Sequence, residues 1–490
     1  MKKTNSNLPI LLLFFTGIFL FFIFCIFTTE FNCADRIWNF QNIYKMHQGA
    51  LIYTNNNVII TPLFFFLGNL LFHLFGANLF VYDAYGIIIY MAKFTLLFAI
   101  FKKLKQKNFL STLYTSIWLI LDSSYLSNSA NYNQLALVFS LIGIFCYLSS
   151  YPKKSYHLIQ GFLLFLIFFT KQTTGIYYAF GILLFELICP ESRQNFFQSQ
   201  LLKLASFLPC TLFTCIILYW QGNFTDFINL CFGSILEFGT SNQIFSWSDI
   251  KYIFLLSFII GFSTFVIKSE NVSNSIKIHT KFLLCLSLGM TFNMYPLLNG
   301  YHINMAMFFY YITFIYIIDQ LLISEIFTAK QHTTISLIIS FGILLALFIR
   351  VGFAYFTNYI HLQHFDKNHP FYNTAIASEN KEKINTITNY IKTKNATGTQ
   401  VIVLSYEAAS YMIPLNLNNN ELDLATCGNL GYHGIQNTIQ KISNMKHTEF
   451  LIFTEEDDCF YQESKEIRNY ILTHLKKTDE LLNYSIYINE

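Results

Sequence analysis

Long apolar runs separated by short polar stretches make up most of the first 352 residues of this chain. A run of about 20 apolar residues is long enough to cross the hydrocarbon core of a membrane as a helix. We therefore predict about eleven transmembrane helices, at residues 9–28, 83–101, 109–126, 131–150, 157–172, 174–190, 204–220, 249–267, 281–297, 302–322 and 331–352. The expected fold class is an α-helical polytopic membrane protein.

One further apolar stretch, 60–76, is short and is broken by Pro62, Gly68 and His73. If it lies along the membrane surface, the basic residues between the runs fall on the cytoplasmic side, as the positive-inside rule requires. These residues are Lys2, Lys3, Lys102, Lys103, Lys105, Lys107, Lys153, Lys154, Arg193, Lys203, Lys268, Lys277 and Lys330. A full crossing would place nearly all of them outside. We therefore expect an interfacial helix within a first external loop at about 29–82.

The chain changes character after the last apolar run. From about 366 to 490 it is polar, with the strand-like segments TQVIVLSY, EFLIFTE and NYSIYINE. These alternate with the helical segments SENKEKINTITNYIKTKN, IQNTIQKISNM and SKEIRNYILTHLKK. Strands and helices in turn predict a small α/β domain. With an odd number of spans and a cytoplasmic N-terminus, this domain is expected outside the membrane.

Composition supports this division and limits the function. The chain is 54% hydrophobic and only 12% charged, which excludes a soluble protein of this size. A net charge of +3 without a basic face gives no sign of a nucleic-acid partner. We find no GxGxxG after a strand, no Walker A, HExxH or GxSxG motif, and no zinc-like cysteine spacing. We therefore expect no nucleotide cofactor and no bound metal.

Asp35 follows the first apolar run by a few residues, next to Arg36, so it should lie near the outer membrane surface. A carboxylate held there can take a proton from a hydroxyl group that attacks a substrate. The alternative is an ordinary solvated loop aspartate beside Arg36.

Lys171 and Gln172 interrupt two apolar runs in the segment FFTKQTTG. A lysine at membrane depth is costly unless an anionic or polar group receives it. An ammonium and an amide at such a break could hold a phosphate and offset the charge of a phosphate leaving group. The alternative is a lysine whose ammonium snorkels to the interface.

Further candidates lie at the predicted outer ends of other spans. Tyr301 and His302 lie in an external turn, where His302 could donate to a phosphate or belong to an aromatic belt. Asp122 could position an acceptor or cap the following helix. Arg350 could contact a phosphate or snorkel from the end of the last span.

In their order along the chain, these pieces resemble the GT-C superfamily of integral-membrane glycosyltransferases, in particular its family 39-like members. The relevant pieces are Asp35, GALIY, the surface segment ITPLFFFLGNLLFHLFG, TKQTTG, the YP…H turn at 295–302, and YEAASYMIPL…CGNLGYHG. The resemblance covers about residues 1–352, and the last piece resembles the external domain of a bacterial subgroup. The family often has two acidic residues in the first loop. Here Arg36 replaces one of them, which leaves Asp35 alone and disfavours a metal-assisted reaction.

The resemblance implies inverting transfer of a sugar from a polyprenyl-phosphate donor to a hydroxyl group on the outer membrane face. Asp35 would be the general base, Lys171, His302 and Arg350 would contact the donor phosphate, and Arg36, Asp122, Gln172 and Tyr301 would position substrate. The acceptor could be an envelope polymer, a lipid or a protein. A flippase or transporter for a lipid-linked sugar is the alternative from another functional class. A missing internal repeat, the long first loop and the external domain count against it.

Overall fold

A computed structural model describes residues 8–28, 34–104, 108–122, 130–190, 195–234, 250–294, 300–323 and 329–359. It also describes 362–490, apart from 367, 373, 420–421, 423–424, 426–429, 431–433 and 455–463. The chain forms two compact units. The first comprises 1–28, 86–214 and 244–356, and the second comprises 29–85, 215–243 and 357–490.

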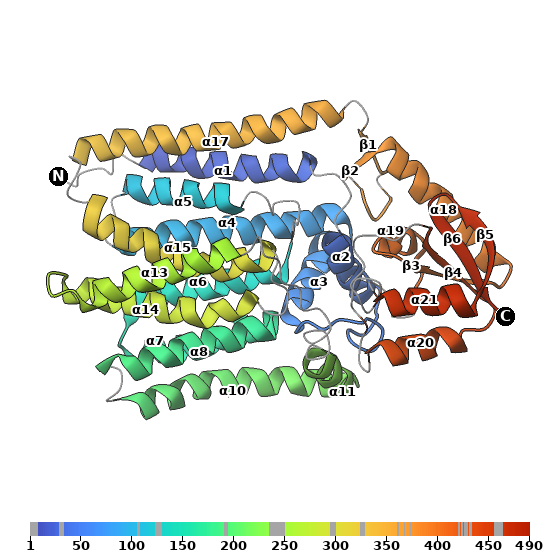
Figure 1. The fold of residues 1–490 in the computed structure, drawn as a ribbon, viewed down its shortest axis with the longest axis horizontal. Coiled ribbons are helices and arrows are strands. Elements are labelled where there is room, and N and C mark those ends of the chain that lie inside the picture. The colour runs from blue at the N-terminus through green and yellow to red at the C-terminus, as the bar shows by residue number, and fades with distance from the viewer. Residues whose placement is uncertain are drawn as a thin grey trace. The chain divides into compact units, whose positions relative to one another are not determined.

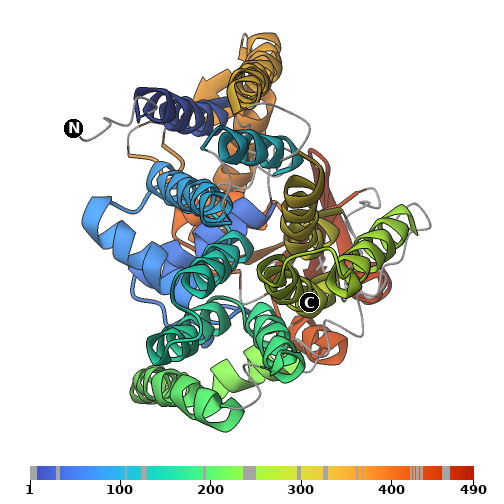
Figure 2. The same ribbon diagram turned by 90° about the vertical axis from the view of Figure 1, so that its left-hand side faces the viewer.

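The first unit is a set of helices lying side by side (Figures 1 and 2). They are α1 (Leu8–Thr28), α4 (Leu79–Lys103), α5 (Asn108–Asp122), α6 (Tyr132–Ser150), α7 (Lys154–Thr170), α8 (Gln172–Ile188), α10 (Phe196–Trp220), α13 (Ile250–Lys268), α14 (Asn274–Met290), α15 (Gly300–Ile318) and α17 (Ala329–Tyr359). A helix therefore lies at each predicted span. Residues 123–126 and 295–297, which end two of those spans, lie outside the described residues.

The expected helical membrane fold is confirmed, whereas the number of crossings stays a prediction. Within the described residues, seven helices are long and apolar enough to cross a membrane: α1, α4, α6, α10, α13, α15 and α17. Helices α5, α7 and α8 are apolar but have only 15, 17 and 17 residues. At 1.5 Å per residue they are about 22–26 Å long, shorter than the roughly 30 Å hydrocarbon core.

Helices α7 and α8 form a tight hairpin whose only linking residue is Lys171. His157 and Glu186, each about four turns from Lys171, lie beside each other at the opposite end, which shows that the helices fold back on one another. Gly175 permits the close turn, since a Cβ there would lie 2.5 Å from the Cα of Phe168. Helix α8 also packs closely on α14, where Gly181 and Gly289 meet. Small residues allow such close approach between membrane helices.

The second unit contains the first loop. Helices α2 (Ala34–His47) and α3 (Leu63–Phe75) pack together, and Gly68 of α3 lies against the side chain of Ile43. The other side of α3 leaves Leu70, Leu74 and Phe75 exposed. A helix at the predicted interfacial position thus presents an apolar face. The second loop contributes α11 (Phe224–Ile228) and the π-helix η2 (Asn229–Ser234), joined to the first loop by a hydrogen bond from Asn223 Nδ2 to the oxygen of Ile52 at 3.0 Å.

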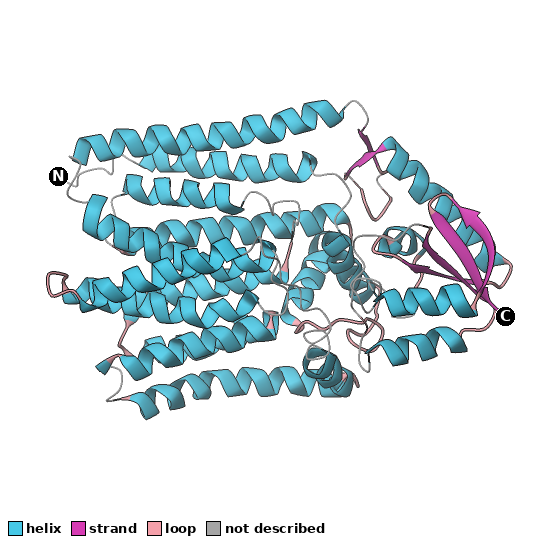
Figure 3. Ribbon diagram, in the orientation of Figure 1, coloured by secondary structure: helices cyan, strands magenta, loops and turns pink. Residues whose placement is uncertain are grey.

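The end of the chain is an α/β fold, as predicted (Figure 3). Its sheet has the strand order β3-β4-β6-β5, with β3 and β4 parallel and the other pairs antiparallel. The elements are the hairpin β1 (Leu362–His364) and β2 (Ala375–Ala377), then α18 (Ser378–Ala396), β3 (Gln400–Leu404), α19 (Ala408–Met412), η6 (Ile413–Leu415), α20 (Gly434–Asn444), β4 (Thr448–Phe453), α21 (Ser464–His474), β5 (Lys476–Leu481) and β6 (Tyr484–Asn489).

All three predicted strands and all three predicted helices of this region are confirmed, but the short strands β1 and β2 and the edge strand β5 were missed. The predicted last helix included Lys476 and Lys477, which instead begin β5. This strand lies at the sheet edge, and nearly all its side chains are exposed. A polar edge strand has no apolar alternation to reveal it, and its charges discourage pairing with other chains.

Candidate functional site

Lys171 is the most unusual charged residue of the helical unit. Its side chain is only 9% exposed, so it does not snorkel to the surface as the alternative reading required. Among the described residues, no carboxylate forms an ion pair with it. A buried ammonium without a counter-charge is strongly destabilising. Its position therefore fits a group that receives an anion.

Other polar groups surround the same turn. The imidazole of His302, in the first turn of α15, lies close enough to interact electrostatically with Lys171. Gln172 is buried at the start of α8. One turn further, the hydroxyl of Thr174 donates to Asn293 Oδ1 at 3.1 Å, which connects α8 to the short helix η4 (Thr291–Met294). The predicted pair of Lys171 and His302 is therefore brought together by tertiary structure.

Asp122 has a partner that the sequence did not reveal. Its carboxylate accepts a hydrogen bond from Lys93, and Lys93 also donates to Gln134 Oε1 at 2.7 Å. Lys93 is fully buried in the middle of α4. The cap role considered for Asp122 was wrong, because Asn131 caps α6 by accepting from the backbone N–H of Asn133 at 2.7 Å. Asp122 therefore neutralises a lysine at membrane depth.

A small cavity borders this ion pair and has room for about one water molecule. It is lined by Trp118, Leu121, Asp122, Gln134, Leu137, Asn304, Met305 and Phe308. Asn304 follows His302 by two residues on α15, so this helix contributes to the surroundings of both Asp122 and Lys171.

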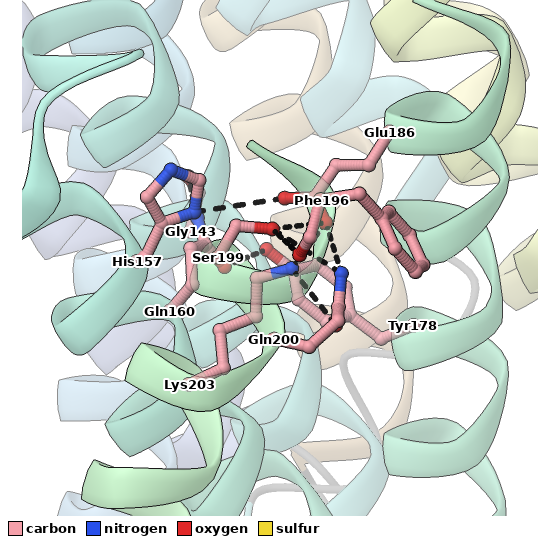
Figure 4. A network of polar contacts seen from close by, with 9 residues as sticks. All are labelled: Gly143, His157, Gln160, Tyr178, Glu186, Phe196, Ser199, Gln200 and Lys203. Atoms are coloured by element: carbon pink, nitrogen blue, oxygen red, sulfur yellow. Dashed lines mark hydrogen bonds and ion pairs between the residues drawn. The ribbon is translucent and has the colours of Figure 1, made fainter. Parts of the chain in front are cut away.

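A third polar cluster holds α7, α8 and α10 together (Figure 4). Glu186 accepts hydrogen bonds from Lys203 at 2.5 Å and from Gln200 at 2.6 Å, and His157 Nδ1 lies 3.6 Å from its other oxygen. The sequence reading counted Lys203 only as a basic residue of a cytoplasmic loop. Lys203 lies 17 residues from Glu186 and on another helix, so the sequence gave no sign of the contact.

Asp35 lies in the first turn of α2, where a carboxylate is favoured by the helix dipole. It belongs to a helix and not to a solvated loop. Its side chain is exposed, yet the surrounding protein desolvates the carboxylate and raises its pKa above the usual value. An accessible carboxylate with a raised pKa has the properties of a general base.

Arg36 points in a different direction from Asp35. It is buried and pairs with Asp83, with one hydrogen bond from Nε to Oδ1 at 3.1 Å and a second from its terminal nitrogen to Oδ2. This bidentate pair fastens α2 to the start of α4. On the same side, the ring of Phe40 packs against Tyr82, Phe72 and Phe371. Asp35 is thus carried by a firmly held helix, and the predicted substrate contact of Arg36 stays a prediction.

The two remaining candidates are less informative. Arg350 is exposed on α17, which packs on α1 through contacts such as that between Phe21 and Phe348. Figures 1 and 2 place α17 and α1 at one edge of the helical unit and α7 and α8 toward the other. The structure thus does not bring the helix of Arg350 beside Lys171. Tyr301 lies in α15, and its side chain is outside the described residues.

No protein-family model matches this chain, and no curated protein matches it. Among solved structures, ArnT from Cupriavidus metallidurans in the apo state is similar over 99% of this chain and 99% of that chain, with a TM-score of 0.49 and 8% sequence identity. ArnT from the same organism bound to undecaprenyl phosphate gives a TM-score of 0.48 and 8% identity, over 99% of this chain and 98% of that chain. At this level of similarity, the function has to be inferred from the residues of this chain.

Proposed function

We propose that this protein is an integral-membrane glycosyltransferase that uses a polyprenyl-phosphate-linked sugar as donor. The observation that carries the proposal is Lys171, a buried cation without a carboxylate partner among the described residues. In a helical membrane unit, the anion that can reach such a site from the bilayer is a lipid phosphate.

The surroundings of Lys171 favour a phosphate. The N-terminal ends of α8 and α15, at Gln172 and Gly300, lie next to Lys171 and His302 in the sequence. The positive end of a helix dipole attracts anions, and free N–H groups of a first turn can bind phosphate oxygens. Helices α7 and α8 are shorter than the hydrocarbon core, so a hairpin whose open end lies at the cytoplasmic interface would place its connection just below the outer headgroups, within reach of a lipid-linked phosphate.

Asp35 completes the chemistry as the base. The acceptor oxygen attacks the anomeric carbon from the side opposite the phosphate, which inverts that centre. Asp35 takes the proton of the acceptor hydroxyl. The bond from the anomeric carbon to the phosphate oxygen breaks, and polyprenyl phosphate leaves with its electron pair. Lys171 and His302 stabilise the charge on this leaving group, so no general acid is required.

The proposal also includes the membrane orientation. The N-terminus is cytoplasmic, and Asp35, Lys171 and the C-terminal α/β fold lie on the outer side. Single cysteines replacing the exposed Lys153 and the half-buried Asn395 in a cysteine-free background test this. An impermeant reagent applied to intact cells should label only Asn395→Cys. Labelling of Lys153→Cys alone would invert the orientation.

The function itself is tested with Asp35→Asn, which keeps the shape of the side chain and removes the base. Transfer from a polyprenyl-phosphate hexose should fall about 10²- to 10⁴-fold, with donor binding and membrane insertion retained. Undiminished transfer would refute the assignment of the base. Movement of the lipid-linked sugar across sealed vesicles, without a new glycosidic bond, would instead support a flippase.

A further inference from the structure

Helix α2 carries a buried asparagine on the same face as the proposed base. Asn39 follows Asp35 by four residues, so the two side chains lie one above the other, with Cβ atoms about 5–6 Å apart. Asp35 is exposed, whereas Asn39 is only 1% exposed. This face of the helix is therefore accessible at Asp35 and enclosed one turn later.

The amide of Asn39 has an unused hydrogen-bond acceptor. Its Oδ1 is buried and has no hydrogen-bond partner among the described residues. Buried polar atoms are nearly always hydrogen-bonded, so an unpaired one marks a place where a bound molecule can supply the donor.

Asn42 on the same helix provides a contrast. It is also buried, but its Nδ2 donates to the backbone oxygen of Trp38 at 2.9 Å, within the helix itself. Burial of an asparagine in α2 therefore does not by itself prevent an internal hydrogen bond. The unpaired acceptor therefore distinguishes Asn39, one turn from Asp35, from Asn42.

We propose that Asn39 is a positioning residue for the acceptor. This inference rests on the proposed function. The Oδ1 of Asn39 accepts a hydrogen bond from a second donor group of the acceptor, beside the hydroxyl that Asp35 deprotonates. The spacing of one helical turn suits two neighbouring hydroxyls of a sugar or other polyol. The acceptor is therefore a carbohydrate-type molecule with adjacent hydroxyl groups, and not a lone alcohol.

Asn39 holds the acceptor, so it is dispensable when water takes the acceptor's place. Hydrolysis of the donor and transfer to an acceptor then share Asp35 but differ in their need for Asn39. The partition between the two reactions reports on Asn39 separately from folding, because hydrolysis serves as an internal measure of intact protein.

The experiment uses the full-length protein with a radiolabelled polyprenyl-phosphate hexose and envelope membranes of a deletion strain as the acceptor source. Asn39→Leu, which has a similar volume and no acceptor atom, should lower transfer about 3- to 10-fold relative to hydrolysis. Asn39→Ser keeps an uncharged acceptor oxygen on this face of the helix and should recover part of the transfer. The matched control Asn42→Leu should leave the ratio of transfer to hydrolysis unchanged.

The possible failures are separable. If Asn39→Leu lowers hydrolysis and transfer in equal proportion, or leaves both unchanged, Asn39 does not position the acceptor, and this inference is wrong. If Asp35→Asn retains both reactions, the proposed function itself fails, whatever Asn39 does. A ratio that falls as much in Asn42→Leu as in Asn39→Leu would also refute a specific role for Asn39.

Discussion

The two ends of the α7–α8 hairpin carry buried charge in opposite ways. At one end, the charge of Glu186 is matched by Lys203, and Ser199 and Gln200 also donate to the same oxygen, Oε2, while His157 lies 3.6 Å from Oε1. At the other end, Lys171 is buried without a carboxylate among the described residues. The same two helices thus show what a compensated structural network looks like and what an uncompensated site looks like. This difference is the basis of our proposal that Lys171 binds a ligand.

The largest loss of stability is expected when one partner of the Glu186–Lys203 ion pair is removed. Glu186→Leu leaves Lys203 buried without its counter-charge, and breaking a buried ion pair in this way costs about 3–5 kcal/mol. We expect a marked fall of the thermal unfolding midpoint in detergent. Glu270→Leu is the matched control, because Glu270 is exposed and should change the midpoint little. Unchanged stability of Glu186→Leu would mean that the network does not hold the hairpin.

Substitution of Lys171, at the other end of the hairpin, should lower transfer activity without lowering the unfolding midpoint. Lys171→Met removes the cation that we propose stabilises the leaving group, so transfer should fall about 10²- to 10³-fold, as for loss of one electrostatic contact in an active site. The unfolding midpoint should stay the same or rise, since an unpaired buried charge is lost. The control Lys268→Met removes an exposed lysine at the end of α13. A destabilised but fully active Lys171→Met protein would make Lys171 a structural residue and remove the contrast.

A double substitution sharpens the comparison further. Replacing both Glu186 and Lys203, as in Glu186→Leu with Lys203→Met, removes the ion pair as a unit. Such replacements are often close to neutral, so most of the stability lost in Glu186→Leu should return. His157 then loses its carboxylate neighbour, which leaves a small residual cost. Unfolding midpoints of the two single variants and the double variant give the coupling between the two residues. Simple additivity would argue against a direct interaction.

The desolvated environment of the Asp35 carboxylate predicts that both stability and activity depend on pH. Its raised pKa means that the folded protein binds this proton more tightly than the unfolded chain, whose aspartate pKa is about 3.9. The free energy of unfolding should therefore decrease as pH rises from the unfolded-state pKa of Asp35 to its raised pKa in the folded protein. Transfer activity should be lost as pH falls through the raised pKa, because the base becomes protonated. Asp35→Asn should remove both effects. An acid limb of transfer at or below the ordinary aspartate pKa would contradict desolvation of the base.

The candidate site was predictable only where its members are unusual in the local sequence. Lys171 was recognisable because a cation interrupts apolar runs, and Asp35 because it follows the first span closely. Lys93 was overlooked although it lies inside an apolar run, which is the signal that could have revealed it. Asp83 lies at the start of a predicted span and Asn39 in the predicted first loop, where polar residues are expected, and only burial and contacts distinguish them.

Hydrophobic patterning alone determined the helices of the membrane unit and most of the α/β fold. An apolar run or a strand–helix alternation is a property of neighbouring residues and survives without tertiary information. Tertiary structure decided which charges are compensated: Asp122 pairs with Lys93, Glu186 with Lys203 and Arg36 with Asp83, whereas Lys171 meets His302. The reason is physical, because the energy of a buried charge depends on groups that packing brings close, however far apart they are in the chain.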